Sequence, residues 1–143
     1  MKTTLFALTL ALSCAGAFAQ ATPAGLWKTI DDDTKQERSL VRITDNGGTL
    51  AGKVEKLMDA SKQDASCEKC TDARKDKPIL GMTILEGVKK NPDEAYWDSG
   101  TILDPNNGKT YKVRLTPKDG GKTLEVRGFI GLFYRNQQWI RVE

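Results

Sequence analysis

The sequence contains no histidine. This absence removes the commonest general base, the commonest protein metal ligand and the usual pH switch near neutrality. A Ser-His-Asp triad or a Cys-His pair is therefore impossible in this chain. Cysteine is also scarce, because the chain has only three, and a four-ligand zinc site cannot be completed from them. We predict no catalytic residues, no metal and no cofactor, and hence a protein that is not an enzyme.

Clustered charge and long apolar segments are lacking as well. The formal net charge is +3, and Lys and Arg are interspersed with Asp and Glu along the whole chain. Nucleic-acid binding requires cations gathered in a patch or stripe, so no nucleic-acid partner is predicted. No segment has the periodicity of a convincing amphipathic helix, and after the first nineteen residues no apolar run is long enough to cross a bilayer.

The first segment, Met1 to Ala19, has the pattern of a secretory signal peptide. Lys2 supplies a positive start, Leu5 to Phe18 is nearly all apolar, and Ala17-Phe18-Ala19 fits the small-x-small cleavage rule. The sequence therefore predicts cleavage after Ala19 and export to the periplasm or the cell exterior.

An alternative is lipoprotein processing at Cys14. That motif expects Leu three residues before the Cys, and this chain has Ala11 there, so soluble export is favoured. Residues 20–143 then form one domain with no integral membrane segment, long enough for a single modest core.

The mature chain keeps two cysteines, Cys67 and Cys70. A Cys-x-x-Cys pair can be a redox site, but such a site normally follows a strand and opens a helix. Here the pair follows the polar stretch Met58–Ser66. Because disulfides persist in exported proteins, we predict a structural disulfide between Cys67 and Cys70 that pins a long loop.

Gly100 to Gly131 shows the dominant pattern of the chain, which is two β-hairpins in succession. Apolar residues alternate with polar ones in each strand, so each strand has one apolar and one wet face. Asp104–Gly108 and Lys118–Gly121 supply turn residues. The same pattern predicts strands at residues 25–30, 39–44, 49–57, 79–85, 95–103, 111–116, 123–127 and 137–142.

About eight strands joined mostly by short turns predict an all-β fold, an antiparallel meander that closes into a barrel. An open sandwich is the alternative. The long connection from Met58 to about Pro78 is expected to be functional or poorly ordered, and it could hold a short helix.

Gly25-Leu26-Trp27 in the first strand and Trp139-Ile140-Arg141 in the last resemble the calycin arrangement of lipocalins. The resemblance implies that Trp27 packs at the closed end of the barrel with Arg141 across it, a cation–π contact that seals the floor. Ordinary core packing is the competing explanation for Trp27.

A wider set of segments resembles a family of exported bacterial proteins, domain of unknown function 2147. This resemblance implies a lipocalin-like barrel over Gly25 to Val142 and no established activity. Some relatives carry further cysteines near the end, where this chain has Phe129, Gly131 and Phe133. The matching segments are Cys67–Cys70, Lys77–Gly81, Gly100–Tyr111, Leu124–Gly128 and Trp139–Arg141.

Three functions are consistent with this sequence. The first is binding of a small, mainly apolar ligand, such as a fatty acid or another lipid, inside the barrel. Core packing is the competing role for each of the aromatic residues that could line the cavity or its rim. These are Tyr96, Trp97, Tyr111, Phe129 and Phe133.

The second hypothesis is a structural or interaction protein of the cell envelope, with Met58–Pro78 or Phe129–Tyr134 as the contact. Exposed Phe133 and Tyr134 would favour a protein partner, whose identity the sequence does not indicate, and inward aromatics would favour a ligand.

The third hypothesis is an enzyme. Its candidate residues are explained more simply, because Asp104 has the position of a turn cap and Arg127 that of a solvent-facing strand residue. The other residues considered are Asp98 and Glu125, and a redox enzyme would require Cys67 and Cys70 to cycle.

Overall fold

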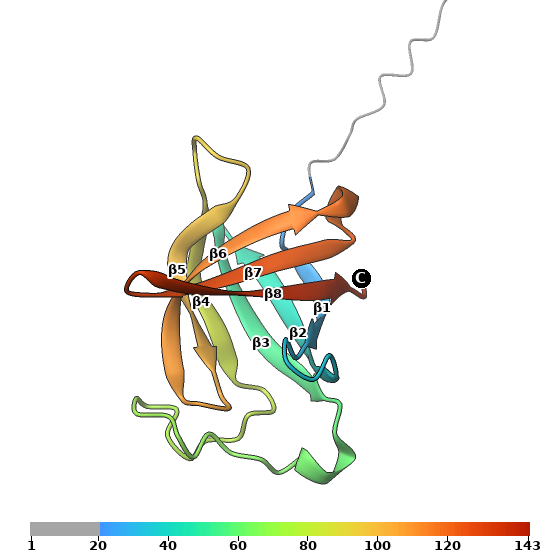
Figure 1. The fold of residues 1–143 in the computed structure, drawn as a ribbon, viewed down its shortest axis with the longest axis vertical. Coiled ribbons are helices and arrows are strands. Elements are labelled where there is room, and N and C mark those ends of the chain that lie inside the picture. The colour runs from blue at the N-terminus through green and yellow to red at the C-terminus, as the bar shows by residue number, and fades with distance from the viewer. Residues whose placement is uncertain (1–20) are drawn as a thin grey trace, which may run out of the picture.

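The computed structural model describes residues 21–143, so the predicted signal peptide and Cys14 lie outside the described residues. Eight antiparallel strands form a closed barrel in which each strand pairs with its neighbour in sequence and β8 returns to β1 (Figure 1). The predicted all-β meander barrel is therefore confirmed. The strands are β1 (Gly25–Ile30), β2 (Glu37–Asn46), β3 (Thr49–Leu57), β4 (Thr83–Lys90), β5 (Trp97–Asp104), β6 (Lys109–Lys118), β7 (Thr123–Ile130) and β8 (Phe133–Arg141).

Local sequence explains most of the hairpins. Gly47 and Gly48 turn the chain between β2 and β3 with φ of +67° and +94°, which glycine adopts without steric cost. The Asp45 carboxylate accepts a hydrogen bond of 2.7 Å from the Gly48 amide and fixes this turn.

Alternation along the strands produces one core. Its members are apolar residues from every strand of the barrel together with Met82, which precedes β4, and the two cysteines. Trp27, Leu85, Leu115 and Leu124 are fully buried. The remaining large members include Val41, Ile43, Leu50, Val54, Val88, Val113, Val126 and Trp139.

One predicted strand is misplaced. The continuous apolar run at residues 79–85 predicts a strand over its whole length, but β4 begins at Thr83 and continues to Lys90. The run is interrupted because Gly81 adopts φ +85°, and the Met82 amide turns back to donate 3.0 Å to the Ile79 carbonyl. The true strand is completed by Val88, which is fully buried.

The long connection between β3 and β4 lies below the barrel in the view of Figure 1 and holds a 3-10 turn, η1 (Ala60–Lys62). The Asp59 carboxylate caps this turn by accepting 2.9 Å from the Ser61 amide. A second 3-10 turn, η2 (Asp119–Gly121), joins β6 to β7. None of the helices formed by residues 21–143 has the length and apolar character needed to span a membrane.

The β1–β8 seam closes the barrel over a very short distance. Two residue pairs join β1 to β8, Trp27 with Arg141 and Lys28 with Ile140, whereas β7 and β8 pair along their full length. Backbone hydrogen bonds between Leu26 and residues 142–143 extend the seam just past the end of β8. Arg141 strengthens this seam, because its guanidinium carbon lies 4.2 Å from the centre of the buried Trp27 ring.

The Arg141 guanidinium also binds the backbone around the barrel floor. It donates 2.5 Å to the Gly121 carbonyl, 2.9 Å to Ala24 and 2.6 Å to Thr22. Gly25 makes room for this group, since a Cβ there would lie 2.5 Å from Arg141 Nη1. One side chain therefore ties together the N-terminal segment, the β6–β7 turn and the last strand.

We expect Arg141→Ala to lower the free energy of unfolding by about 3 kcal/mol, because several charge-assisted hydrogen bonds and a cation–π contact are lost together. Arg42→Ala is the matched control. Arg42 forms ion pairs with Glu55 and Glu143 on the barrel exterior, and because solvent screens these pairs its loss should leave the unfolding midpoint nearly unchanged. Urea unfolding followed by tryptophan fluorescence measures both variants. Equal losses of unfolding free energy would contradict the role of Arg141 in holding the barrel floor together.

Candidate functional site

A cavity of about 560 Å³ occupies the barrel at the end opposite the Trp27 floor. This volume falls within the range typical of small-molecule sites. Its apolar wall comes from five strands and the β3–β4 connection. The wall consists of Val54, Leu57, Ile79, Ile84, Ile102, Val126 and Trp139.

Polar side chains surround the mouth of this cavity. The β1–β2 loop contributes Asp31, the start of β2 contributes Arg38, and the β3–β4 connection contributes Lys62, Glu68 and Lys69. A bound molecule would therefore meet apolar walls in the interior and charged groups at the entrance.

Between the short β1–β8 seam and the mouth, side-chain hydrogen bonds connect the β1–β2 loop to β8 in place of strand pairing. The Asp32 carboxylate accepts hydrogen bonds from Arg135 and, at 2.9 Å, from Gln137 Nε2. Gln137 in turn accepts 3.1 Å from the Trp139 indole. Arg135 also lies 3.8 Å from the Asp104 carboxylate, so a connected polar network spans the mouth from β8 to the β5–β6 turn.

This network favours the charged form of Asp32. The Arg135 guanidinium, helped by the Gln137 amide, lowers the pKa of the Asp32 carboxyl against the opposing effect of partial burial. The neighbouring Asp31 holds the loop itself, because its carboxylate accepts 2.7 Å from the Thr34 amide and forms an ion pair with Arg38. These contacts lower the pKa of Asp31 as well.

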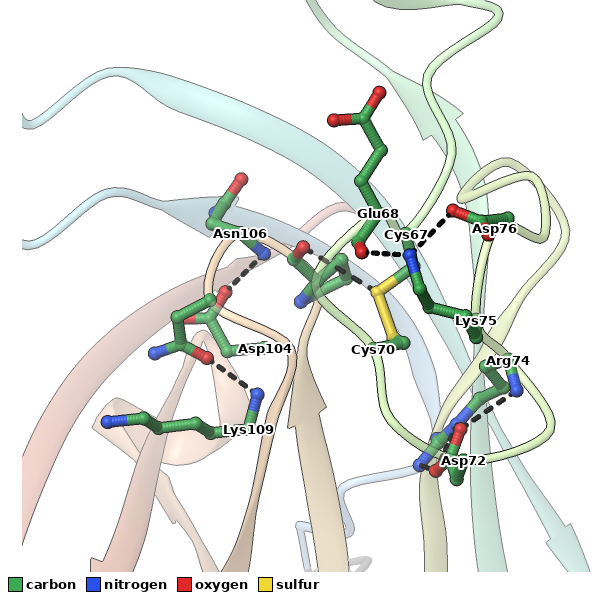
Figure 2. The surroundings of a disulfide bond; sticks show 12 residues. Cys67, Glu68, Cys70, Asp72, Arg74, Lys75, Asp76, Asp104, Asn106 and Lys109 are labelled. Atoms are coloured by element: carbon green, nitrogen blue, oxygen red, sulfur yellow. Dashed lines mark hydrogen bonds and ion pairs between the residues drawn. A yellow bond between two sulfur atoms is a disulfide. The ribbon is translucent and has the colours of Figure 1, made fainter.

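The predicted disulfide between Cys67 and Cys70 is present and both residues are buried (Figure 2). It lies in the connection that supplies part of the mouth, and Cys67 Sγ is 3.7 Å from the Pro105 carbonyl oxygen. Burial of both sulfurs restricts access by a thiol partner, which favours the structural role over redox cycling.

Gly108 explains how closely the disulfide loop approaches the β5–β6 turn. Its φ is +71°, and a Cβ there would lie 1.9 Å from the Lys69 carbonyl oxygen, a distance that backbone cannot accommodate. The turn is set by its own side chains. Asp104 accepts 2.9 Å from the Asn106 amide, and Asn107 accepts 2.8 Å from the Lys109 amide while donating 2.8 Å to the Tyr111 hydroxyl.

The five aromatic residues considered as ligand contacts are dispersed. Tyr111 lines the cavity, whereas Trp97 is packed in the core. Tyr96 and Phe129 lie near the Arg114 guanidinium, with ring centres at 4.2 and 5.3 Å, and Phe133 is exposed. The β6–β7 register explains the difference between Tyr111 and Phe129. Tyr111 lies two residues from the buried Val113 and faces inward, whereas Phe129 is opposite Lys112, which faces outward.

The residues considered for catalysis do not converge either. Asp104 lines the mouth, where it caps its turn as predicted. Arg127 pairs with Glu125 at 3.7 Å and donates 2.7 Å to Asn136, while Asp98 accepts 3.1 Å from Asn91. They therefore form no common cluster that could carry an acid–base pair.

Sequence reasoning missed the polar network of the mouth. Asp32 is one of three consecutive aspartates in a turn, and nothing local distinguishes it from Asp31 or Asp33. Arg135 and Gln137 do share the parity of the buried Trp139, which is a usable signal for inward-facing residues.

Gly108→Ala is expected to destabilise the protein by about 3 kcal/mol, because positive φ and the backbone clash with Lys69 act together. Gly120→Ala is the matched control. Its φ of +64° is similar but open space surrounds it, so about 1 kcal/mol of backbone strain is expected. Denaturant unfolding of both variants, with the disulfide confirmed by mass, tests the contact. Equal losses would show that the mouth loops are not tightly packed.

Asp32→Asn should lower the free energy of unfolding by about 1 kcal/mol at pH 7, because the interaction with Arg135 is partly exposed. Because the pKa of the Asp32 carboxyl is lower in the folded protein, this stabilisation is fully present at pH values above the unfolded carboxyl pKa of about 3.9. The difference between the two proteins should therefore shrink as pH falls from about 5 to 2. Asp33→Asn, which removes none of these contacts, is the control, and a pH-independent difference would contradict the network.

Comparison with known proteins supports the same architecture. No curated protein sequence matches this chain. Protein HP1028 of the human pathogen Helicobacter pylori, a structure described as belonging to the lipocalin family, is similar with a TM-score of 0.72 and 19% identity, over 86% of this chain and 84% of that one. At this identity the similarity concerns the fold. A family described as an uncharacterised protein conserved in bacteria, domain of unknown function 2147, matches residues 25–141, and the chain belongs to that family.

Proposed function

We propose that this protein is exported and binds one small, mainly apolar molecule in the barrel cavity. The observation that carries the proposal is the 560 Å³ cavity with apolar walls and a charged mouth. Such a site stabilises a ligand by removing its apolar surface from water, while the mouth groups contact its polar end. The lipocalin-like fold adds support by analogy.

Export rests on two observations. The first is the signal-peptide pattern of Met1 to Ala19, with cleavage proposed after Ala19. The second is the Cys67–Cys70 disulfide, which is consistent with an oxidising compartment such as the periplasm or the cell exterior.

A cavity-filling variant tests ligand binding. We expect native mass spectrometry of gently purified protein to show a bound hydrophobic molecule, and the probe N-phenyl-1-naphthylamine to gain fluorescence on binding. Ile102→Trp places a large ring in the cavity wall and should weaken probe binding at least about tenfold, because the space is occupied.

Ile140→Trp is the matched control, since the same substitution is made at a half-exposed position outside the cavity. Circular dichroism checks that both variants keep the barrel. Wild-type protein that binds neither a native molecule nor the probe, or an Ile102→Trp variant that binds as tightly as the control, would refute the carrier function.

An interaction role is a second candidate function, and one observation favours it. Phe133 and Tyr134 are 78% and 60% exposed, which is the arrangement expected of a contact surface. Both functions can coexist, because neither residue is among those that line the cavity.

A further inference from the structure

The turn between β7 and β8 carries the most exposed large hydrophobic side chains among residues 21–143. Leu132 is 98% exposed, Phe133 78%, Tyr134 60% and Ile130 50%. We call these four residues the hairpin tip. In Figure 1 the hairpin tip projects to the left beyond the neighbouring strands.

Both faces of the hairpin are apolar at its tip. Ile130 pairs with Phe133, and the pair faces the same side of the sheet as Gly128 and Arg135. Gly128 and Arg135 form the pair two residues further from the turn and line the cavity. On the opposite face Phe129 pairs with Tyr134, and their ring centres are 6.2 Å apart. Leu132 stands at the turn itself. The tip is therefore a wedge with apolar groups on both faces and at its end.

Cations lie along the outer face of the sheet at the base of this wedge. The Arg127 guanidinium lies 4.4 Å from the Tyr134 ring centre, Arg114 lies 5.3 Å from that of Phe129, and Lys112 is opposite Phe129 in the adjacent strand. The Arg127 guanidinium also lies 3.7 Å from the Glu125 carboxylate, which offsets part of its charge. Arg135 is excluded from this set of cations because it donates hydrogen bonds to the Asp32 carboxylate.

We propose that the hairpin tip inserts into the surface of a lipid bilayer that carries anionic headgroups. Leu132, Phe133 and Ile130 would enter the boundary of the acyl chains, and Tyr134 would lie at headgroup level, where amphipathic aromatic rings are favoured. Lys112, Arg114 and Arg127 would then face anionic headgroups, each adding to the attraction.

A lipid surface fits the geometry better than a protein strand. β8 pairs with β1 only at its end, so the edge over Phe133–Gln138 could accept a strand from a partner or from a second copy of this chain. A strand added there would cover one side of the hairpin and leave Leu132 at the turn in water. A fluid lipid surface surrounds all sides of a projecting wedge.

Docking would bring the cavity mouth close to the lipid, because the inner face of the tip continues directly into the cavity wall. Insertion of the tip into lipid does not require that the cavity hold a ligand.

Vesicle co-sedimentation tests the proposal on the chain lacking residues 1–19. We expect binding to vesicles that contain phosphatidylglycerol, weaker binding to phosphatidylcholine vesicles, and a loss of affinity at high salt because the cations are screened. The double variant Leu132→Ser, Phe133→Ser should bind at least about tenfold more weakly, since two inserted side chains are lost.

Val142→Ser is the matched control, because Val142 is 49% exposed beyond the opposite end of β8 and should leave binding unchanged. Leu132→Trp supplies a positive signal, since the described tryptophans lie away from the tip. The emission of the introduced indole should shift to the blue with vesicles and be quenched by lipids brominated on the acyl chain.

Three results would overturn the proposal. The wild-type chain could fail to bind anionic vesicles, the double variant could bind them as well as the control, or the indole introduced by Leu132→Trp could stay unquenched. If analytical ultracentrifugation instead shows a dimer that the double variant abolishes, with no vesicle binding, the tip is an interface between copies of this chain.

Discussion

Closure of the barrel at its floor is the constraint on which the rest of the structure depends. The β1–β8 seam is short, since it consists of two residue pairs and the backbone hydrogen bonds between Leu26 and residues 142–143. Arg141 compensates by stacking on Trp27 and by donating to carbonyl groups of the N-terminal segment and the β6–β7 turn. Its burial lowers the pKa of the guanidinium, but arginine remains charged across the physiological range. Toward the opposite end β1 and β8 are no longer paired, while the hairpins β5–β6 and β7–β8 stay paired up to their turns.

The open end is organised by individual contacts within and between its loops. Asp31 shapes the β1–β2 loop, the Cys67–Cys70 bridge shapes the β3–β4 connection, and Gly108 lets the β5–β6 turn approach it. Asp32 then links the first loop to β8 through Arg135. The last two contacts join segments that are far apart in the sequence, so the loops of the mouth hold one another in place.

The last hairpin connects the interior of the barrel with its exterior surface. Along its inner face, Trp139 is buried, Gln137 and Arg135 form the polar mouth, and Phe133 extends beyond the rim. One strand therefore contributes to the core, to the cavity and to the exposed tip in succession. The proposed ligand site and the proposed lipid contact are adjacent for this reason.

Local alternation and turn residues in the sequence were sufficient to predict eight strands, their order and a barrel, because side-chain parity and turn chemistry act over only a few residues. The same reasoning misplaced β4, since a continuous apolar run has no parity to mark where the chain turns. It also could not separate Tyr111, which lines the cavity, from Phe133, which shares the inward parity of β8 but lies past the rim. Parity determines which face of the wall a side chain occupies. Its depth along the barrel, and the pairing of Asp32 with Arg135 from 103 residues further along the chain, depend on register and closure, which only the tertiary structure decides.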